Sequence, residues 1–282
     1  MTPDFSAYLR EVRALRLPHE RGGPENLVVL ERVESTNLLA KAVAADYHRE
    51  CQDLPPALFL AFEQTGGRGR LGRSWSSPAG LGVYATLSMP LPDTAALATL
   101  PLLVGVGLCR GLDPHLLPSS RPSLKWPNDV EVAGRKIGGI LIESMIQPRA
   151  CAVAIVGFGV NHGQGRSELP TERATSLRLA CGGRAPGVSL ARLAWDLVAA
   201  VEAELAHLGD VERAVAAYRE RSAHRPGDRI TARLGPGPEP GPEPTTGTVE
   251  GRFAGFDEHG RLRLERDGGG EVVLSAGEVI ER

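Results

Sequence analysis

Residues 151–161 constrain the fold most, because they form a nearly uninterrupted apolar run, Cys-Ala-Val-Ala-Ile-Val-Gly-Phe-Gly-Val-Asn. A run without alternating polar residues is typical of a strand covered on both faces, so Cys151–Val160 is predicted to be a central strand. Asn161 then emerges at the carboxyl end of this strand, where α/β sheets commonly bind ligands. The sequence therefore predicts an α/β sheet with a ligand site at that end.

Other segments have the periodicity of the strands and helices that would accompany such a strand. The further predicted strands are Leu27–Val33, Leu58–Glu63, Gly82–Met89 and a hairpin of Val130–Val132 and Lys136–Glu143 that turns at Ala133-Gly134. The predicted helices are Asp4–Arg16, Leu38–Asp46, Thr94–Leu112, Leu190–Leu208 and Val211–Arg221.

From Pro226-Gly227 onward the composition changes to short strands separated by glycine turns. This pattern predicts a small β-barrel, with strands just after Asp228 and at Thr246–Phe256, Leu262–Glu265 and Glu271–Leu274. Gly235–Pro244 is predicted to be a mobile proline-glycine loop without chemistry of its own. We expect three parts, namely a helical extension at 1–24, a main domain at 25–223 and a C-terminal domain at 224–282.

Composition excludes several classes of protein. The net charge of -2 argues against a surface given over to nucleic acid, which requires a strongly basic field. The cysteines and histidines are too scattered for a metal site or a disulfide framework, so we expect no protein-bound metal and reduced, mostly buried thiols at Cys51, Cys109, Cys151 and Cys181. No apolar run reaches the ~20 residues of a membrane span, and no signal-peptide core begins the chain, which predicts a cytoplasmic protein.

The segment Gln64–Pro78, called here the arginine loop, holds three arginines and four glycines within Gly66–Arg73. Glycine lets the backbone approach a ligand closely, and each guanidinium is a permanent cation that suits phosphate or carboxylate. The loop therefore predicts an anionic small-molecule ligand. A solvated basic surface loop is the alternative that the segment alone leaves open.

Two common phosphate motifs also fit this loop by their letters. Gly67, Gly69 and Gly72 match the dinucleotide fingerprint, and Gly67–Ser74 matches a P-loop with Arg73 in place of the lysine. Both motifs need a helix that begins at the glycines, and the following Trp-Ser-Ser-Pro-Ala-Gly cannot propagate one. We therefore expect neither motif to operate here.

Two further positions combine polar groups with predicted element ends. Ser35 and Thr36 precede a helix, so their hydroxyls could cap it or could bind a polar ligand. Lys125 ends a strand before Trp126-Pro127, where it could be an exposed edge-strand lysine or a ligand contact. Each position alone favours the structural role.

Five motifs together resemble those of the biotin protein ligases, in order and in spacing, from about Val28 to the C-terminus. They are Ser35-Thr36-Asn37, Gln64 with the run Gly67–Trp75, Lys125-Trp-Pro-Asn-Asp129, Arg135-Lys136-Ile-Gly-Gly139 and Gly157-Phe-Gly-Val-Asn161. Several motifs in one order are more specific than any single motif.

The resemblance implies a mixed sheet with flanking helices, related to class II aminoacyl-tRNA synthetases, followed by an SH3-like barrel. It also implies two half-reactions. Biotin and MgATP would give biotinyl-5′-AMP, which would then acylate one lysine on the biotin carboxyl carrier domain of acetyl-CoA carboxylase or a related carboxylase. Joining a carboxylate to the α-phosphate brings anions together, so such a site needs fixed cations more than a nucleophile of its own.

The resemblance also implies roles for individual residues. Lys125, Arg68 and Arg70 would be catalytic, with Lys125 between carboxylate and phosphate and the arginines in a ligand-closing loop. Biotin would be bound by Ser35, Thr36, Asn37, Gln64, Arg68, Gly69, Arg70, Lys125 and Gly138. ATP would be bound by Arg70, Arg73, Trp75, Asn128, Lys136 and Asn161, with Trp75 near adenine and Mg²⁺ entering only on the nucleotide.

Other functions remain as alternatives. Lipoate protein ligases use the same adenylate chemistry, but the arginine-rich and Lys-Trp-Pro-Asn motifs favour biotin. A nucleic-acid binder using the arginine loop would require strongly salt-dependent binding, against which the acidic balance counts. Some family members carry an N-terminal winged helix-turn-helix, but about 24 residues precede the main domain here, too few for its three helices, so we expect neither specific DNA nor a membrane as a partner. The sequence leaves open the acceptor carrier and whether the protein is a monomer or a homodimer.

Overall fold

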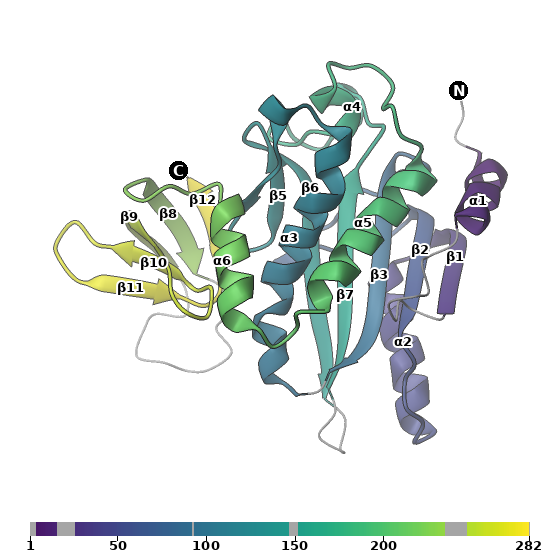
Figure 1. The fold of residues 1–282 in the computed structure, drawn as a ribbon, viewed down its shortest axis with the longest axis horizontal. Coiled ribbons are helices and arrows are strands. Elements are labelled where there is room, and N and C mark those ends of the chain that lie inside the picture. The colour runs from purple at the N-terminus through teal and green to yellow at the C-terminus, as the bar shows by residue number, and fades with distance from the viewer. Residues whose placement is uncertain (1–3, 16–25, 92, 147–151, 235–246, 282) are drawn as a thin grey trace.

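The computed structural model describes residues 4–15, 26–91, 93–146, 152–234 and 247–281. Its strands form a seven-stranded sheet and a five-stranded sheet (Figure 1). The predictions for Cys151, for residues 235–244 and for the end of the first helix at Arg16 lie outside the described residues.

The seven-stranded sheet has the order β1-β2-β3-β7-β6-β5-β4. β1 and β2 pair in parallel and the other neighbours pair antiparallel, so the sheet is mixed. Every residue of β7 is buried, which confirms the central apolar strand. The strands are β1 (Asn26–Val33), β2 (Ala57–Gln64), β3 (Gly82–Leu91), β4 (Ser123–Lys125), β5 (Asp129–Val132), β6 (Arg135–Ile146) and β7 (Ala152–Asn161).

Helices cover both faces of this sheet. They are α1 (Phe5–Ala14), α2 (Thr36–Arg49), α3 (Leu100–Leu112), α4 (Leu177–Ala180), α5 (Leu190–Leu205) and α6 (Val211–Arg221). α3, α5 and α6 lie on one face with α1 beside α5, whereas α2 packs against β2, β3 and β7 on the other (Figure 1). A mixed sheet with flanking helices is therefore confirmed.

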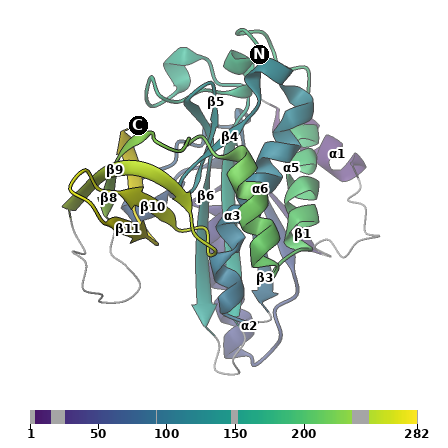
Figure 2. The ribbon, with the colours of Figure 1, turned by 60° about the vertical axis from the view of Figure 1, so that its left-hand side comes forward.

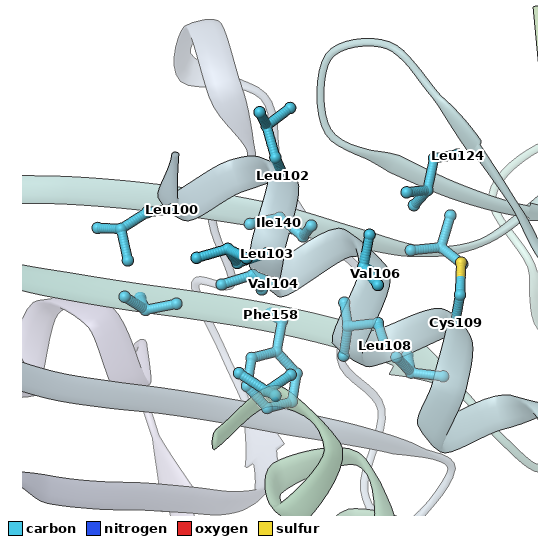
Figure 3. Close-up of a cluster of buried hydrophobic side chains, with 14 of the residues drawn as sticks. Leu100, Leu102, Leu103, Val104, Val106, Leu108, Cys109, Leu124, Ile140 and Phe158 are labelled. Atoms are coloured by element: carbon cyan, nitrogen blue, oxygen red, sulfur yellow. The ribbon is translucent and has the colours of Figure 1, made fainter. Parts of the chain in front are cut away.

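The core lies mainly between α3 and the sheet. Nearly every residue of α3 is buried, as expected for a helix that is apolar on all sides. Figure 3 shows its side chains Leu103 and Val104 in one buried apolar cluster with Ile140 of β6 and Phe158 of β7. This core holds β6 and β7 in place, and both strands contribute to the site described below.

Some elements begin or end at residues other than those predicted. α2 runs from Thr36 to Arg49 rather than over 38–46, and its N-cap Ser35 makes no side-chain capping hydrogen bond to any described residue. The segment 94–112 was predicted as one helix but begins with a separate 3₁₀ turn at Ala95–Ala98. Pro101 then occupies the first turn of α3, where its missing N–H costs no hydrogen bond.

The described cysteines are free, as expected. Cys109 is buried and Cys181 is partly buried, but Cys51 is exposed, so the prediction of mostly buried thiols is wrong for Cys51. The reason is local, since Cys51 lies in the turn that follows the surface end of α2.

The five-stranded sheet is antiparallel throughout, with the order β11-β10-β9-β8-β12. Its strands are β8 (Arg229–Leu234), β9 (Gly247–Phe256), β10 (Leu262–Glu265), β11 (Glu271–Leu274) and β12 (Glu278–Glu281). The sequence did not predict β12. Figures 1 and 2 show this sheet beside α6, and the Tyr218 and Phe256 rings meet there edge to face with centroids 5.2 Å apart.

Among the described residues, no helix is both long and apolar enough to cross a membrane.

Candidate active site

A cavity opens near the carboxyl end of β7, between the arginine loop and β12. Both sheets contribute to its lining, the smaller one through Gly277, Glu278 and Val279. Of the predicted ligand-binding residues, those that line the cavity are Ser35, Thr36, Asn37, Gln64, Arg68, Gly69, Arg70, Arg73, Trp75, Lys125, Asn128 and Lys136.

Two predicted site residues, Gly138 and Asn161, are not among the described residues that line the cavity. The Asn161 amide is used elsewhere, because Nδ2 donates to the Thr175 carbonyl at 2.8 Å and Oδ1 accepts from Gln164 Nε2 at 3.2 Å. Gly138 packs against the backbone of β7, with the site of a Cβ only 2.9 Å from the Gly159 carbonyl oxygen. Asn161 and Gly138 therefore hold strands and loops together beside the cavity.

The inner end of the cavity is formed by Ser35, Thr36, Asn37 and Gln64. Oε1 of Gln64 accepts from the Thr36 backbone N–H at 2.9 Å and lies 3.1 Å from Thr36 Oγ1. Nε2 of Gln64 donates to Ser77 Oγ at 2.9 Å. The Gln64 amide is thus fixed, with its oxygen toward Thr36.

Asn37 connects the inner end to a layer of polar side chains behind it, formed by Lys41, Thr86 and Glu143. Asn37 donates from Nδ2 to the Leu141 carbonyl at 3.2 Å and to Glu143 Oε2 at 3.1 Å, while its Oδ1 lies 2.7 Å from Thr86 Oγ1. Lys41 pairs with Glu143 at 2.8 Å. Burial raises the pKa of the Glu143 carboxyl, but hydrogen bonds from Lys41 and Asn37 outweigh burial and hold its pKa below the ordinary value. Glu143 is therefore a carboxylate.

Glycines let two side chains approach β7. A Cβ at Gly157 would lie 2.0 Å from Asn37 Oδ1, and a Cβ at Gly159 would lie 2.4 Å from Trp75 Nε1. Any larger residue would displace Asn37 in the first case and the indole in the second. β7 thus supports both ends of the cavity, two residues apart.

The arginine loop is a narrow hairpin. The backbone N–H of Trp75 donates to the Gly67 carbonyl at 2.8 Å, and the backbone N–H of Gly69 donates to the Arg73 carbonyl at 2.7 Å. Between these two bonds, Arg68 and Ser74 form a β-bridge. The segment contains a short 3₁₀ turn at Arg70–Gly72 but no α-helix begins at the glycines, as expected if neither the P-loop nor the dinucleotide motif operates here. At the tip, Leu71 has φ 56°, a left-handed conformation that costs a leucine roughly 1–2 kcal/mol.

The outer end of the cavity consists of Arg70, Arg73, Trp75 and Lys136. Arg73 donates two hydrogen bonds of 2.5 Å to the carboxylate of Glu278 on β12. These bonds raise the pKa of Arg73 and lower the pKa of Glu278. This ion pair, called here the Arg73–Glu278 clasp, connects the C-terminal sheet to the arginine loop.

Arg70 points toward the cavity and is more buried. Its guanidinium donates to Asn128 Oδ1 at 3.3 Å, and burial lowers its pKa, partly offset by the charges of Asp129 and Glu278. Asn128 in turn donates from Nδ2 to the Ile140 carbonyl at 2.9 Å. A cation partly removed from water, with one long neutral hydrogen bond, is well suited to an anionic ligand.

Trp75 packs on Gly139 and Gly159 of the sheet, beside a cation. Lys136 Nζ is 5.4 Å from the Trp75 ring centroid and 2.6 Å from Asp129 Oδ1. Trp75 Nε1 is buried without a hydrogen-bond partner among the described residues. This indole is therefore a flat, immobilised surface suited to stacking.

Lys125 ends β4, as predicted, and lines the cavity together with groups of both ends. Its charge acts on Glu278, whose pKa it helps to lower. Lys125 and the guanidinium groups of the arginine loop thus surround one cavity with cations, while its inner end offers neutral hydrogen-bonding groups. The arrangement suits a ligand that is polar and neutral at one end and anionic in the middle.

Sequence reasoning missed several residues that build this site. Glu278 lies in β12, a strand that was not predicted. Glu143 and Lys41 belong to none of the five motifs found in the sequence. For Thr86 the sequence offered one weak sign of a special role, namely a polar residue within the apolar part of the predicted strand Gly82–Met89. The structure shows that this residue is fully buried.

Sequence models of two families match the chain. The Biotin/lipoate A/B protein ligase family matches residues 29–161, and the Biotin protein ligase C terminal domain matches residues 244–282. The Biotin--[acetyl-CoA-carboxylase] ligase of Mycobacterium tuberculosis is 33% identical over 264 residues, which cover 92% of this chain and 90% of that protein. A Bifunctional ligase/repressor BirA of Bacillus spizizenii is 28% identical and is covered to 73% of its length, against 89% of this chain.

Solved structures show the same fold. The biotin protein ligase from Aquifex aeolicus in complex with biotin and ATP aligns over 90% of this chain and 97% of its own, with a TM-score of 0.66 and 23% identity. The biotin protein ligase from Leishmania major in complex with biotinyl-5-AMP aligns over 90% of this chain and 100% of its own chain, with a TM-score of 0.56 and 23% identity.

Proposed function

Because the chain belongs to the biotin protein ligase family, we propose that the cavity between the arginine loop and β12 is the place where it joins biotin to AMP and then passes biotin to a carrier lysine. The chain is an enzyme that activates biotin with ATP and transfers biotin to a carboxylase. The two ends of the cavity support this assignment, since one end is neutral and polar and the other is cationic and aromatic.

Activation forms one P–O bond and breaks another. The biotin carboxylate attacks the α-phosphorus of ATP, pyrophosphate leaves, and the mixed anhydride biotinyl-5′-AMP results. Negative charge concentrates on the α-phosphate in the transition state, so cations fixed in advance lower the barrier. Lys125 and Arg70 would supply these cations, and Arg68 would close over the ligand with the rest of the arginine loop.

Transfer then requires a carrier lysine in its neutral form. Its amine attacks the biotinyl carbonyl carbon, an amide bond forms as the nitrogen loses one proton to solvent, and AMP leaves with the electrons of the broken C–O bond. Exclusion of water protects the anhydride before the lysine arrives. The biotin carboxyl carrier domain of acetyl-CoA carboxylase, or of a related acyl-CoA carboxylase, is the proposed acceptor.

The remaining predicted residues are proposed in the following roles. Thr36, Gln64 and Ser35 bind the polar ring of biotin, and Asn37 supports them from behind. Trp75 stacks near adenine, with Lys136 and Asn128 on the same side and Arg73 beside the phosphates. Gly69 lets the backbone approach the ligand, whereas Gly138 and Asn161 act indirectly, because their contacts hold the strands beside the cavity.

The proposal also covers the metal ion, the compartment and the partners of the reaction. Mg²⁺ enters as MgATP, since the hard oxygens of the triphosphate are ligands that Mg²⁺ prefers. The reaction takes place in the cytoplasm, without specific DNA or a membrane as a partner. Operator-like DNA should accordingly bind no better than scrambled DNA in a gel-shift assay.

Lipoate activation is the second candidate, because the matching family model also covers lipoate ligases. The dithiolane ring of lipoate has no N–H or C=O groups, so it could form no hydrogen bond with the side chains of Thr36 and Gln64 that line the inner end. Biotin leaves no such mismatch, so it is the favoured substrate.

The test is ATP–pyrophosphate exchange by the purified chain with biotin or lipoate as the acid. Exchange should depend on biotin and should be negligible with lipoate. Exchange that responds to lipoate alone, or to neither acid, would refute the proposed function.

A further inference from the structure

The polar layer behind the inner end contains a chain of hydrogen bonds in which the donor of each bond is fixed by its neighbours. It runs from Glu143 through Asn37 and Thr86 to Thr36. Asn37, Thr86 and Thr36 are all buried, so each polar atom must find its partner inside the protein. The proposed function uses Thr36, but it assigns no role to Glu143 or Thr86.

The direction begins at Glu143. Its carboxylate and the Leu141 carbonyl only accept hydrogen bonds, so the Asn37 group that faces both of them must be the amide nitrogen. The Asn37 oxygen Oδ1 therefore faces Thr86 Oγ1, at 2.7 Å. An amide oxygen carries no proton, so the proton in this contact belongs to the Thr86 hydroxyl.

One hydroxyl carries one proton, and this fixes the next contact. The oxygens of Thr86 and Thr36 are 2.8 Å apart, and the Thr86 proton already lies on its bond to Asn37. The Thr36 hydroxyl then donates to Thr86 rather than to Gln64, because two hydroxyl oxygens 2.8 Å apart need a proton between them and the contact of Thr36 Oγ1 with Gln64 Oε1 is longer, at 3.1 Å. The 3.1 Å contact between Thr36 Oγ1 and Gln64 Oε1 is left without a proton, although Gln64 Oε1 still accepts from the Thr36 backbone N–H.

Two oxygens with free lone pairs therefore lie side by side at the inner end. Both Thr36 and Gln64 line the cavity, so the lone pairs of Thr36 Oγ1 and Gln64 Oε1 are available to a ligand. Two acceptors at this spacing favour an N–H donor between them and disfavour a ligand oxygen.

We propose that Glu143 is a positioning residue that acts through Asn37 and Thr86 to make the inner end an acceptor of hydrogen bonds, so that it selects a ligand ring bearing N–H groups. The inference rests on the proposed function and deepens it, since the ureido ring of biotin bears such groups. Lys41 contributes by keeping Glu143 paired and ionised.

The decisive readout is discrimination between two ligands, which a purely structural role would not alter. The ligands are biotin and an analogue whose ring N–H groups are replaced by oxygen. Wild-type protein should bind biotin more tightly by at least about a hundredfold, measured as the ratio of dissociation constants. Once the chain of hydrogen bonds is cut, the Thr36 hydroxyl is free to turn and donate to the analogue.

Thr86→Val removes the hydroxyl at nearly constant volume and should lower this discrimination by at least about tenfold. Thr86→Ser restores the hydroxyl and should keep the wild-type ratio. Glu143→Gln should also lower the ratio about tenfold, because one amide cannot present an oxygen to both Lys41 and Asn37. Combining Thr86→Val with Glu143→Gln should add little to either change alone.

Asp196→Asn is the matched control. Asp196 is a partly buried, ion-paired carboxylate of similar exposure, 22% against 24% for Glu143, and does not line the cavity. Its removal should leave the ratio unchanged. Wild-type discrimination retained in folded Thr86→Val would overturn the proposal, and this variant with its serine counterpart decides the matter even if Glu143→Gln does not fold. Absence of biotin-dependent exchange in the wild type would instead refute the proposed function.

Discussion

The inner and outer ends of the cavity are built on different principles. At the inner end, buried neutral groups hydrogen-bond to one another in a fixed order, supported by a single ion pair behind them. At the outer end, partly exposed charges are paired with other charges of the protein, such as Arg73 with Glu278 and Lys136 with Asp129.

This difference predicts different responses to a ligand. The inner end is preorganised, so binding a ring there requires little rearrangement and its residues should govern affinity and selectivity. Cations at the outer end can exchange carboxylate partners for phosphate, so their residues should govern turnover and retention of the intermediate. The following variants separate the two roles.

Lys125→Ala should have the largest effect. It removes a cation that is proposed to act where negative charge develops, which is worth about 3 kcal/mol or more in a site shielded from water. Biotin-dependent pyrophosphate exchange should fall at least about a hundredfold at saturating substrates. Circular dichroism would establish that the variant is folded, and unchanged exchange in a folded variant would remove Lys125 from the reaction.

Arg70→Gly should affect retention of the intermediate. Without this guanidinium the arginine loop closes less tightly over the adenylate, so biotinyl-5′-AMP should escape and label exposed lysines of a bystander protein such as serum albumin. We expect bystander labelling to rise about tenfold or more. Arg49→Gly, an exposed arginine on α2 that does not line the cavity, is the control. Equal labelling by both variants would argue against a gate.

Alanine at the two glycines of β7 should separate the ends of the cavity. Gly157→Ala should raise KM for biotin about tenfold, because its Cβ displaces Asn37, and should alter KM for ATP much less. Gly159→Ala should do the reverse, because its Cβ displaces Trp75. Gly165→Ala is the control, since its Cβ would meet its nearest neighbour at 3.4 Å outside the cavity. Equal changes of both KM values in both variants would contradict two separate ends.

Glu278→Gln should have the smallest effect. It weakens the clasp between β12 and Arg73, an exposed ion pair worth about 1 kcal/mol or less. We expect KM for ATP to change by no more than about fivefold and the stability of the protein to change little. A loss of activity as large as that of Lys125→Ala would mean that the clasp is part of the reaction itself.

The main sheet could be predicted from the sequence because its signals are local. The apolar run of β7 predicted a central strand, and the Ala133-Gly134 turn joins β5 to β6 as expected. The ends of α2 were wrong, since Ser35 and Thr36 have a capping sequence, but Thr36 is the first residue of α2, its backbone N–H donates to Gln64 and its hydroxyl bonds to Thr86. Ligand-facing contacts here overrode the local preference of the residues.

The site was predicted where motifs mark it and missed where distant parts of the chain meet. Glu143 is 106 residues from Asn37, and Glu278 is 205 residues from Arg73. No periodicity or motif within one segment connects residues so far apart. The direction of the hydrogen bonds behind the inner end also depends on which atoms lie within reach, and only the fold determines that.

A crystal structure with bound biotinyl-5′-AMP would show directly whether the two ends of the cavity hold the two ends of the intermediate. We expect the ureido ring against Thr36 Oγ1 and Gln64 Oε1, the phosphate beside Lys125 and Arg70, and the adenine on Trp75. Asn37, Thr86 and Glu143 should keep their present contacts. Adenylate bound outside this cavity, or bound in it with the adenine at the inner end, would show that the cavity is not the site proposed here.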